Sequence, residues 1–176
     1  MLSSSLLWIF LAVLLFWAVG AYNRIVRLRS AAIQAFRPLD ADLVRLMALL
    51  GECEEALVTV PGEPVQARTA LQAATLQLGV SLAVARTQPL QAEAAAALST
   101  ARQVVDAASL SAARQLAENA PESRPQWLEQ LEHHQASSEQ AQQQFNQAVQ
   151  QYNDAIAQFP ARLLAWLFGF QPGRTL

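Results

Sequence analysis

The first 23 residues carry no charged side chain, and this opening stretch constrains the fold more than any other part of the chain. Between Leu6 and Ala21 nearly every residue is apolar, with tryptophan and phenylalanine among the aliphatic side chains. An α-helix rises about 1.5 Å per residue, so about 20 apolar residues cross a hydrocarbon layer about 30 Å thick. Residues 1–23 are therefore predicted to form a transmembrane anchor.

Three arginines follow this stretch at once, whereas the residues before it offer no positive side chain. Because basic residues are retained on the cytoplasmic side of a membrane, the N-terminus is expected outside and the rest of the chain in the cytoplasm. The same side chains are candidates for contact with anionic lipid headgroups at the membrane interface. They are Arg24, Arg27 and Arg29.

A cleaved signal peptide is the alternative interpretation of this opening stretch. Small residues at positions 18–20 give a plausible cleavage site after Gly20, and cleavage there would release a secreted or periplasmic helical binding module. A signal peptide normally begins with basic residues, however, and here the basic cluster lies on the opposite side of a long apolar run. These features favour the anchor over the signal.

Behind the anchor, apolar residues recur at alternating steps of three and four, which predicts one long helix with a single buried seam typical of a coiled coil. Pro38 lies inside this pattern and predicts a kink or a restart near Phe36, because proline lacks a backbone donor and disfavours helical geometry before it. Pro61, Gly62 and Pro64 are expected to end the helix. The seam consists of Phe36, Leu39, Leu43, Leu46, Leu50, Cys53, Leu57 and Val60.

Three further helices are predicted in the rest of the chain. One covers about residues 65–86, the next has Pro89 in its first turn, and the last follows a bend at residues 119–125 and continues to Phe159. Hydrophobic residues make up 53% of the chain but aromatic residues only 7%, and this mixture favours helix over strand. The expected fold is all-α: a transmembrane helix followed by an antiparallel, elongated four-helix bundle over residues 24–160.

An even number of helices returns the chain to the end of the bundle from which it started. Residues 161–176 are therefore expected to form an apolar C-terminal segment near the membrane. The aromatic side chains in this segment favour a membrane interface. They are Trp166, Phe168 and Phe170.

Residues that could carry chemistry are few. Cys53 occupies a seam position and is expected to be buried, while His133 and His134 are expected on a solvated helix face because no metal-binding spacing accompanies them. The sequence has no glycine-rich phosphate loop and no nucleophile elbow. The prediction is therefore a protein that is not an enzyme, with no metal, no cofactor and no evident small-molecule substrate. A net charge of −2 also disfavours nucleic acid as a partner.

Two asparagines in the last helix are candidates for specific contacts. Asn146 and Asn153 are seven residues apart and so share one flank of the helix, close to Tyr152. Their amides are expected either to form hydrogen bonds across the bundle that fix its register or to bind a partner helix.

The C-terminal stretch Phe145-Asn146-Gln147-Ala148-Val149, followed by Tyr152-Asn153-Asp154-Ala155-Ile156, Phe159-Pro160 and Leu167-Phe168-Gly169-Phe170, resembles the LemA family of bacterial proteins. Tyr22-Asn23-Arg24-Ile25-Val26-Arg27-Leu28-Arg29 resembles the N-terminal mark of the same family, whereas residues 43–50 depart from its usual pattern.

The resemblance implies a single-pass membrane protein with a helical bundle and no well-established enzymatic activity. We accordingly expect a scaffold or protein-binding module in the bacterial cytoplasmic (inner) membrane. Its expected partners are the lipid bilayer and another membrane or envelope protein, or further copies of itself as a homo-oligomer.

Overall fold

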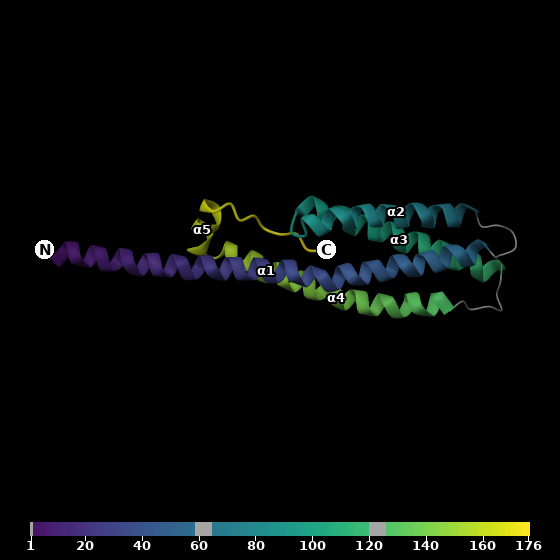
Figure 1. The fold of residues 1–176 in the computed structure, drawn as a ribbon, viewed down its shortest axis with the longest axis horizontal. Helices are drawn as coiled ribbons and strands as arrows, with labels where there is room; N and C mark the ends of the chain where they lie inside the picture. The colour runs from purple at the N-terminus through teal and green to yellow at the C-terminus, as the bar shows by residue number, and fades with distance from the viewer. Residues whose placement is uncertain (1, 59–64, 120–125) are drawn as a thin grey trace.

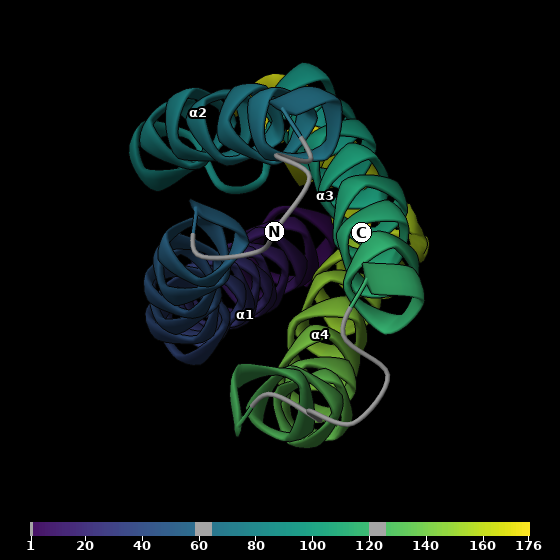
Figure 2. The same ribbon diagram turned by 90° about the vertical axis from the view of Figure 1, so that its right-hand side faces the viewer.

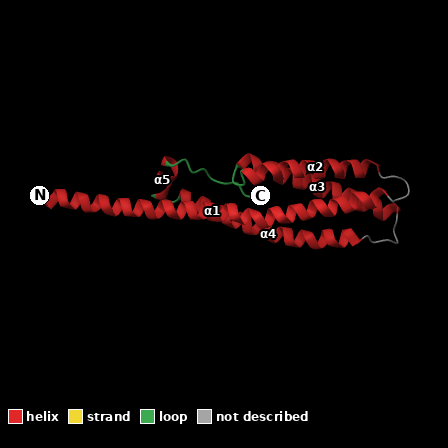
Figure 3. Ribbon diagram, viewed as in Figure 1, coloured by secondary structure: helices red, strands yellow, loops and turns green. Residues whose placement is uncertain are grey.

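The computed structural model describes residues 2–58, 65–119 and 126–176, and within these ranges it contains helices and loops but no strand (Figures 1 and 3). The fold is therefore all-α, as the sequence predicts. In chain order the helices are α1 (Leu2–Val58), α2 (Val65–Thr87), α3 (Ala92–Asn119), α4 (Gln126–Ala157) and the short α5 (Ala161–Leu167).

Helix α1 is a single rod of 57 residues that runs from the apolar opening stretch into the bundle without a break. Of the kink or restart predicted near Phe36, the restart is wrong, because the helix continues through Pro38. Because Pro38 has no backbone N–H, the carbonyl oxygen of Gln34 has no helical hydrogen-bond partner. Both residues are exposed, so water can bind that carbonyl. Phe36 and Leu39 are buried on the opposite side, and their packing holds the helix together across the proline.

The predicted seam of α1 is the core of the bundle. Each of its members from Phe36 to Leu57 is at most 5% exposed, while Val60 lies outside the described residues. Helix α4 packs along this seam, and the ring of Phe145 meets the ring of Phe36 edge to face, with centroids 5.7 Å apart. Two long helices from opposite ends of the sequence thus form one half of the bundle.

Helices α2 and α3 form the other half as an antiparallel hairpin (Figure 2). Many of their buried positions are alanines, which lets the two backbones approach closely. Helix α3 begins at Ala92, three residues later than predicted, because Pro89 and Leu90 form a turn in which the N–H of Gln91 donates to the carbonyl oxygen of Gln88.

The chain leaves, returns, leaves and returns along the bundle axis, so α5 lies beside α1 near the start of the bundle (Figure 1). Phe159, predicted to end the fourth helix, lies beyond it instead and is 82% exposed. After α5 the backbone turns at Gly169, whose φ of 69° is unfavourable for residues with a side chain. Residues 170–176 then run back towards the turn between α2 and α3 (Figure 1).

Candidate functional site

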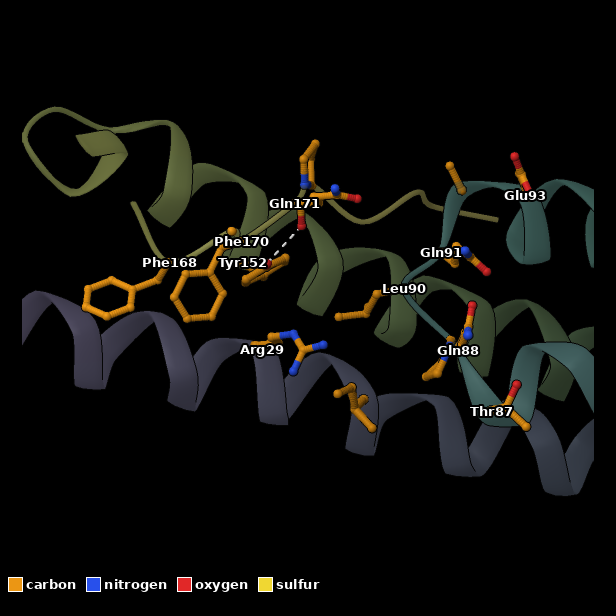
Figure 4. A pocket seen from close by; sticks show the side chains of 15 residues that line it. Arg29, Thr87, Gln88, Leu90, Gln91, Glu93, Tyr152, Phe168, Phe170 and Gln171 are labelled. Carbon is orange, nitrogen blue, oxygen red and sulfur yellow. Dashed lines mark hydrogen bonds between the residues drawn. The ribbon is translucent and has the colours of Figure 1, made fainter. Parts of the chain in front are cut away.

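A cavity of about 770 Å³ lies where α1, the α2–α3 turn, α4 and the C-terminal segment meet (Figure 4). Its polar lining comes from all of these elements, and its apolar walls include Leu90, Phe168 and Phe170. The cavity is open to solvent on one side, where Arg29 is exposed. The polar residues of the lining are Arg29, Thr87, Gln88, Gln91, Glu93, Tyr152 and Gln171.

Tyr152 forms the floor of this cavity and is 1% exposed. Its hydroxyl donates a hydrogen bond of 2.8 Å to the carbonyl oxygen of Gln171 (Figure 4). Burial raises the pKa of the Tyr152 phenol, while the charge of Arg29 and its hydrogen bond to the phenol partly oppose this rise. Tyr152 is therefore a neutral hydrogen-bond donor at physiological pH.

The two asparagines predicted from their spacing both bind the C-terminal segment. Asn153 donates from Nδ2 to the carbonyl oxygen of Gly173 and accepts from the N–H of Gly173, each over 2.8 Å. Asn146 pairs with Leu176 in the same way, at 2.9 and 2.8 Å. Each amide thus binds the backbone of residue 173 or 176 of the same chain, and not another helix of the bundle.

We call residues 170–176 the tail, and the surface of α4 and the α2–α3 turn that holds it the tail groove. The tail runs antiparallel to α4, because Asn153 pairs with Gly173 and the earlier Asn146 pairs with the later Leu176. Seven residues of helix rise about 10.5 Å, and three residues of extended chain span about 10 Å. This match of lengths lets two asparagines two turns apart bind the tail at every third residue.

Gly173 is the point of closest approach between the tail and the groove. A Cβ atom at this position would lie 3.2 Å from Cγ1 of Val149 and 3.4 Å from Cδ2 of Leu90. The first separation is tighter than most contacts of a Cβ atom and the second is at the short end of ordinary van der Waals contact, so a larger residue would require Val149 or the tail to shift. The groove thus favours glycine at this position.

Aromatic side chains fix the start of the tail to α1. The ring of Tyr22 lies 4.9 Å from that of Phe168 and 5.9 Å from that of Phe170, both tilted. Phe170 is partly buried against the core, whereas Phe168 is 56% exposed. The residues proposed from the sequence as an interface group therefore differ in surroundings: Trp166 is 83% exposed, whereas Phe170 is partly buried.

The arginines behind the apolar stretch are also separated by the fold. Arg29 lines the main cavity, while Arg27 is exposed on α1. Arg24 lines a second, smaller cavity of about 410 Å³, between the apolar end of α1 and the link from α4 to α5. The other walls of that cavity include Phe16, Trp17 and Phe159.

A buried polar cluster joins α1 to α4, and no sequence pattern predicted it. His134, expected on a solvated face, is 4% exposed, and that prediction is wrong. Its Nε2 lies 2.9 Å from the backbone oxygen of Asp42 and 3.1 Å from Oδ1 of the same residue. Ser137 donates to Oδ1 over 3.4 Å, while Asp42 Oδ2 and Ser138 Oγ have no hydrogen-bond partner among the described residues.

The buried thiol is confirmed, since Cys53 is 1% exposed. Burial, aided by the neighbouring charge of Glu54, raises the pKa of Cys53 to about 12. A thiol with so high a pKa is a poor nucleophile at neutral pH. Within the described ranges no group of three or more histidine, cysteine or carboxylate side chains could hold a metal ion.

These features define an elongated helical bundle built on one very long N-terminal helix, with a tail pinned by asparagines at its base. The model of the LemA family matches residues 63–176, from the link before α2 to the end of the chain. The match covers more than half of the sequence, so the chain belongs to the LemA family. Neither the search of curated proteins nor that of solved structures found a match.

Proposed function

We propose that this protein is a non-catalytic interaction module held at a membrane by the apolar first part of α1. Of the described helices, α1 is the one long and apolar enough to cross a bilayer, and its apolar window lies wholly outside the buried core. A large unpartnered apolar surface on one rod is unfavourable in water and favourable in lipid.

The observation that carries this proposal is a second apolar surface at the place where the first one ends. Helix α5 and the link before it expose Phe159, Leu163, Trp166 and Leu167 by 61% or more. The contact between Phe168 and Tyr22 holds this surface next to the last residues of the uncharged stretch. Both surfaces can then meet the same bilayer, one spanning it and the other lying in its headgroup region.

The exposed arginines behind the apolar stretch complement this arrangement. Arg24 and Arg27 follow directly after the uncharged segment, where anionic phospholipid headgroups would lie. With the positive-inside tendency, they support a bacterial inner-membrane location with the bundle in the cytoplasm.

The buried groups support a role without catalysis. The Asp42–His134 pair is closed between α1 and α4, and both cavities described above are lined by other residues. A substrate would therefore have no access to the one histidine that has a carboxylate beside it. The exposed glutamines of α4 instead offer a polar surface to a partner protein. Those in its second half are Gln143, Gln144, Gln147, Gln150 and Gln151.

The membrane contact of α5 can be tested on the full chain reconstituted in vesicles of zwitterionic and anionic phospholipid. In a Cys53→Ala background, Leu163→Cys is labelled with an environment-sensitive dye, and spin-labelled lipids are added as quenchers. We expect strong quenching, because position 163 would lie in the headgroup region. Gln143→Cys is the matched control, about 21 Å farther along α4 from its last residue, and should be unaffected.

Equal quenching at both positions, or none at either, would contradict the membrane contact of α5. Anchoring itself is tested by alkaline extraction of native membranes, in which the full chain should stay in the pellet. Mass spectrometry of the mature N-terminus completes the test. A chain that begins at Ala21 would favour the released module instead.

A further inference from the structure

We propose that the tail groove is a docking site for the tail of a second copy of this protein, so that neighbouring copies exchange residues 170–176. This inference names the partner in the interaction role proposed above and rests on that role. Tail exchange is tested in detergent, without a bilayer. A negative result there would not bear on the membrane contact, which the vesicle experiment decides separately.

The groove recognises backbone, and backbone contacts are the same whichever copy supplies the tail. Asn146, Asn153 and Tyr152 make five hydrogen bonds of 2.8 to 2.9 Å to the tail, all of them to peptide N–H or carbonyl groups. Side-chain amides are suited to this, since one asparagine offers both a donor and an acceptor to one peptide unit. An extended segment from another molecule would find the same ladder.

The close approach at Gly173 selects which extended segment fits. A side chain there would crowd Val149, whereas glycine leaves room for the paired hydrogen bonds to Asn153. Peptides with a bulky residue at this position are therefore disfavoured. A second copy of this chain carries the favoured glycine, at the right distance from a residue that pairs with Asn146.

The tail can leave its groove without unfolding a helix. It follows α5 after the turn at Gly169, and the described hydrogen bonds of residues 171–176 all go to α4 side chains. Gln171, Pro172 and Arg174 are exposed, and the contacts that the tail makes with the core are those of Phe170 and Leu176, both partly buried. When two copies exchange the same segment, each contact that a groove loses with its own tail is replaced by the same contact with the tail of the other copy. Exchange is therefore a low-cost route to association.

The first test separates the groove from its resident tail in the full-length protein in detergent. Gly173→Val should expel the tail while leaving every groove residue in place. A fluorescent peptide with the sequence of residues 168–176 should then bind this variant at least tenfold more tightly than it binds the parent protein, as measured by fluorescence anisotropy. The same peptide carrying Gly173→Val should not bind, and adding Asn153→Ala to the protein should weaken binding at least tenfold.

The second test asks for exchange itself. One full-length variant, Gly173→Val, has an open groove and a defective tail; the other, Asn146→Ala with Asn153→Ala, has an intact tail and a defective groove. Mixed with different fluorophores, the two should form a complex that shows energy transfer. A chain carrying all three changes should form none with itself or with either variant.

Several results would overturn the proposal. Failure of the native peptide to bind the Gly173→Val protein is one, provided that its helix content and thermal unfolding match those of the parent protein. Should that variant fold poorly, a chain that ends at Phe170 opens the groove without adding a side chain to it, and the same comparison is decisive. Absence of energy transfer in the mixture would show that the tail binds only the groove of its own chain. If unrelated glycine-containing peptides bind equally well, the groove is not specific for the tail of a second copy and accepts extended segments of other proteins.

Discussion

The side chain of Asn153 pairs with the backbone of Gly173 through two hydrogen bonds of 2.8 Å, one donated and one accepted. The hydrogen-bonding groups on both sides are part-buried. If either partner is lost, the group that remains is therefore only partly able to bind water instead. Together with the equivalent pair at Asn146, this contact decides where the last residues of the chain lie.

Asn153→Ala is expected to loosen the tail with little effect on the bundle. Each hydrogen bond contributes about 0.5 to 1.5 kcal/mol, so the variant should lose about 1 to 3 kcal/mol of local stability. Hydrogen exchange at the amide of Gly173 should accelerate about tenfold to a hundredfold. Gln150→Ala, an exposed change on the same helix, is the control, and equal exchange in the two variants would contradict the ladder.

Phe145→Ala is expected to destabilise the bundle strongly. Phe145 is 0% exposed and packs edge to face on Phe36, so its removal leaves a cavity between α1 and α4. The loss in the free energy of unfolding should be about 3 to 5 kcal/mol, measured by urea unfolding of the full chain in detergent. Phe159→Ala removes the same atoms from an 82% exposed site and should cost less than about 0.5 kcal/mol.

His134→Ala and His133→Ala form a matched pair of adjacent changes. Loss of His134 removes the partner of a buried carboxylate and should lower the free energy of unfolding by about 1 to 3 kcal/mol. His133 is exposed, so its loss should change that quantity by less than about 0.5 kcal/mol. In a double-mutant cycle, His134→Ala and Asp42→Ala should be non-additive, and additive effects would show that the two side chains do not interact.

Cys53 is expected to resist thiol reagents in the folded protein. Because its pKa rises from 9.0 to about 12, almost none of it is thiolate at pH 8. Labelling with a chromogenic disulfide should be slow in detergent and fast in urea, and the signal is unambiguous because the chain has one cysteine. In a Cys53→Ala background, Val58→Cys, exposed on the same helix, should react quickly without urea.

The same pKa shift fixes how this thiol contributes to stability as the pH changes. The folded state keeps the proton that the unfolded chain releases above pH 9.0. The stability associated with the neutral thiol is therefore fully present at pH 7 and is lost progressively between about pH 9 and 12. Cys53→Ala should abolish this component of the alkaline decrease in unfolding free energy, and an unchanged alkaline profile would assign it to other groups.

Periodicity was sufficient to predict much of the fold. The three-and-four spacing identified the buried side of α1, where Leu39, Leu43 and Leu50 are each 1% exposed. The uncharged stretch identified the one apolar window outside the core, and the number of helices placed α5 beside the start of the bundle. These features depend on neighbours within a few turns of one helix, and the sequence displays such neighbours directly.

Where the sequence prediction failed, distant residues decided the outcome. Pro38 should weaken a helix, yet packing of the neighbouring seam residues outweighs the lost hydrogen bond. His134 is polar in a polar stretch, yet it is buried because Asp42, 92 residues away, accompanies it across the α1–α4 contact. A local pattern shows the seam but not how strongly it packs, and it contains no sign of the contact between Asp42 and His134.

The asparagines show both contributions at one place. The sequence by itself determined the all-α class, the buried seam and, through a spacing of seven residues, that Asn146 and Asn153 share one flank of a helix. Only the tertiary structure decided that this flank binds the returning tail and that Gly173 must fit between Val149 and Leu90. The physical reason is that a residue's face follows from local helix geometry, whereas its partner depends on the free energy of packing the whole chain.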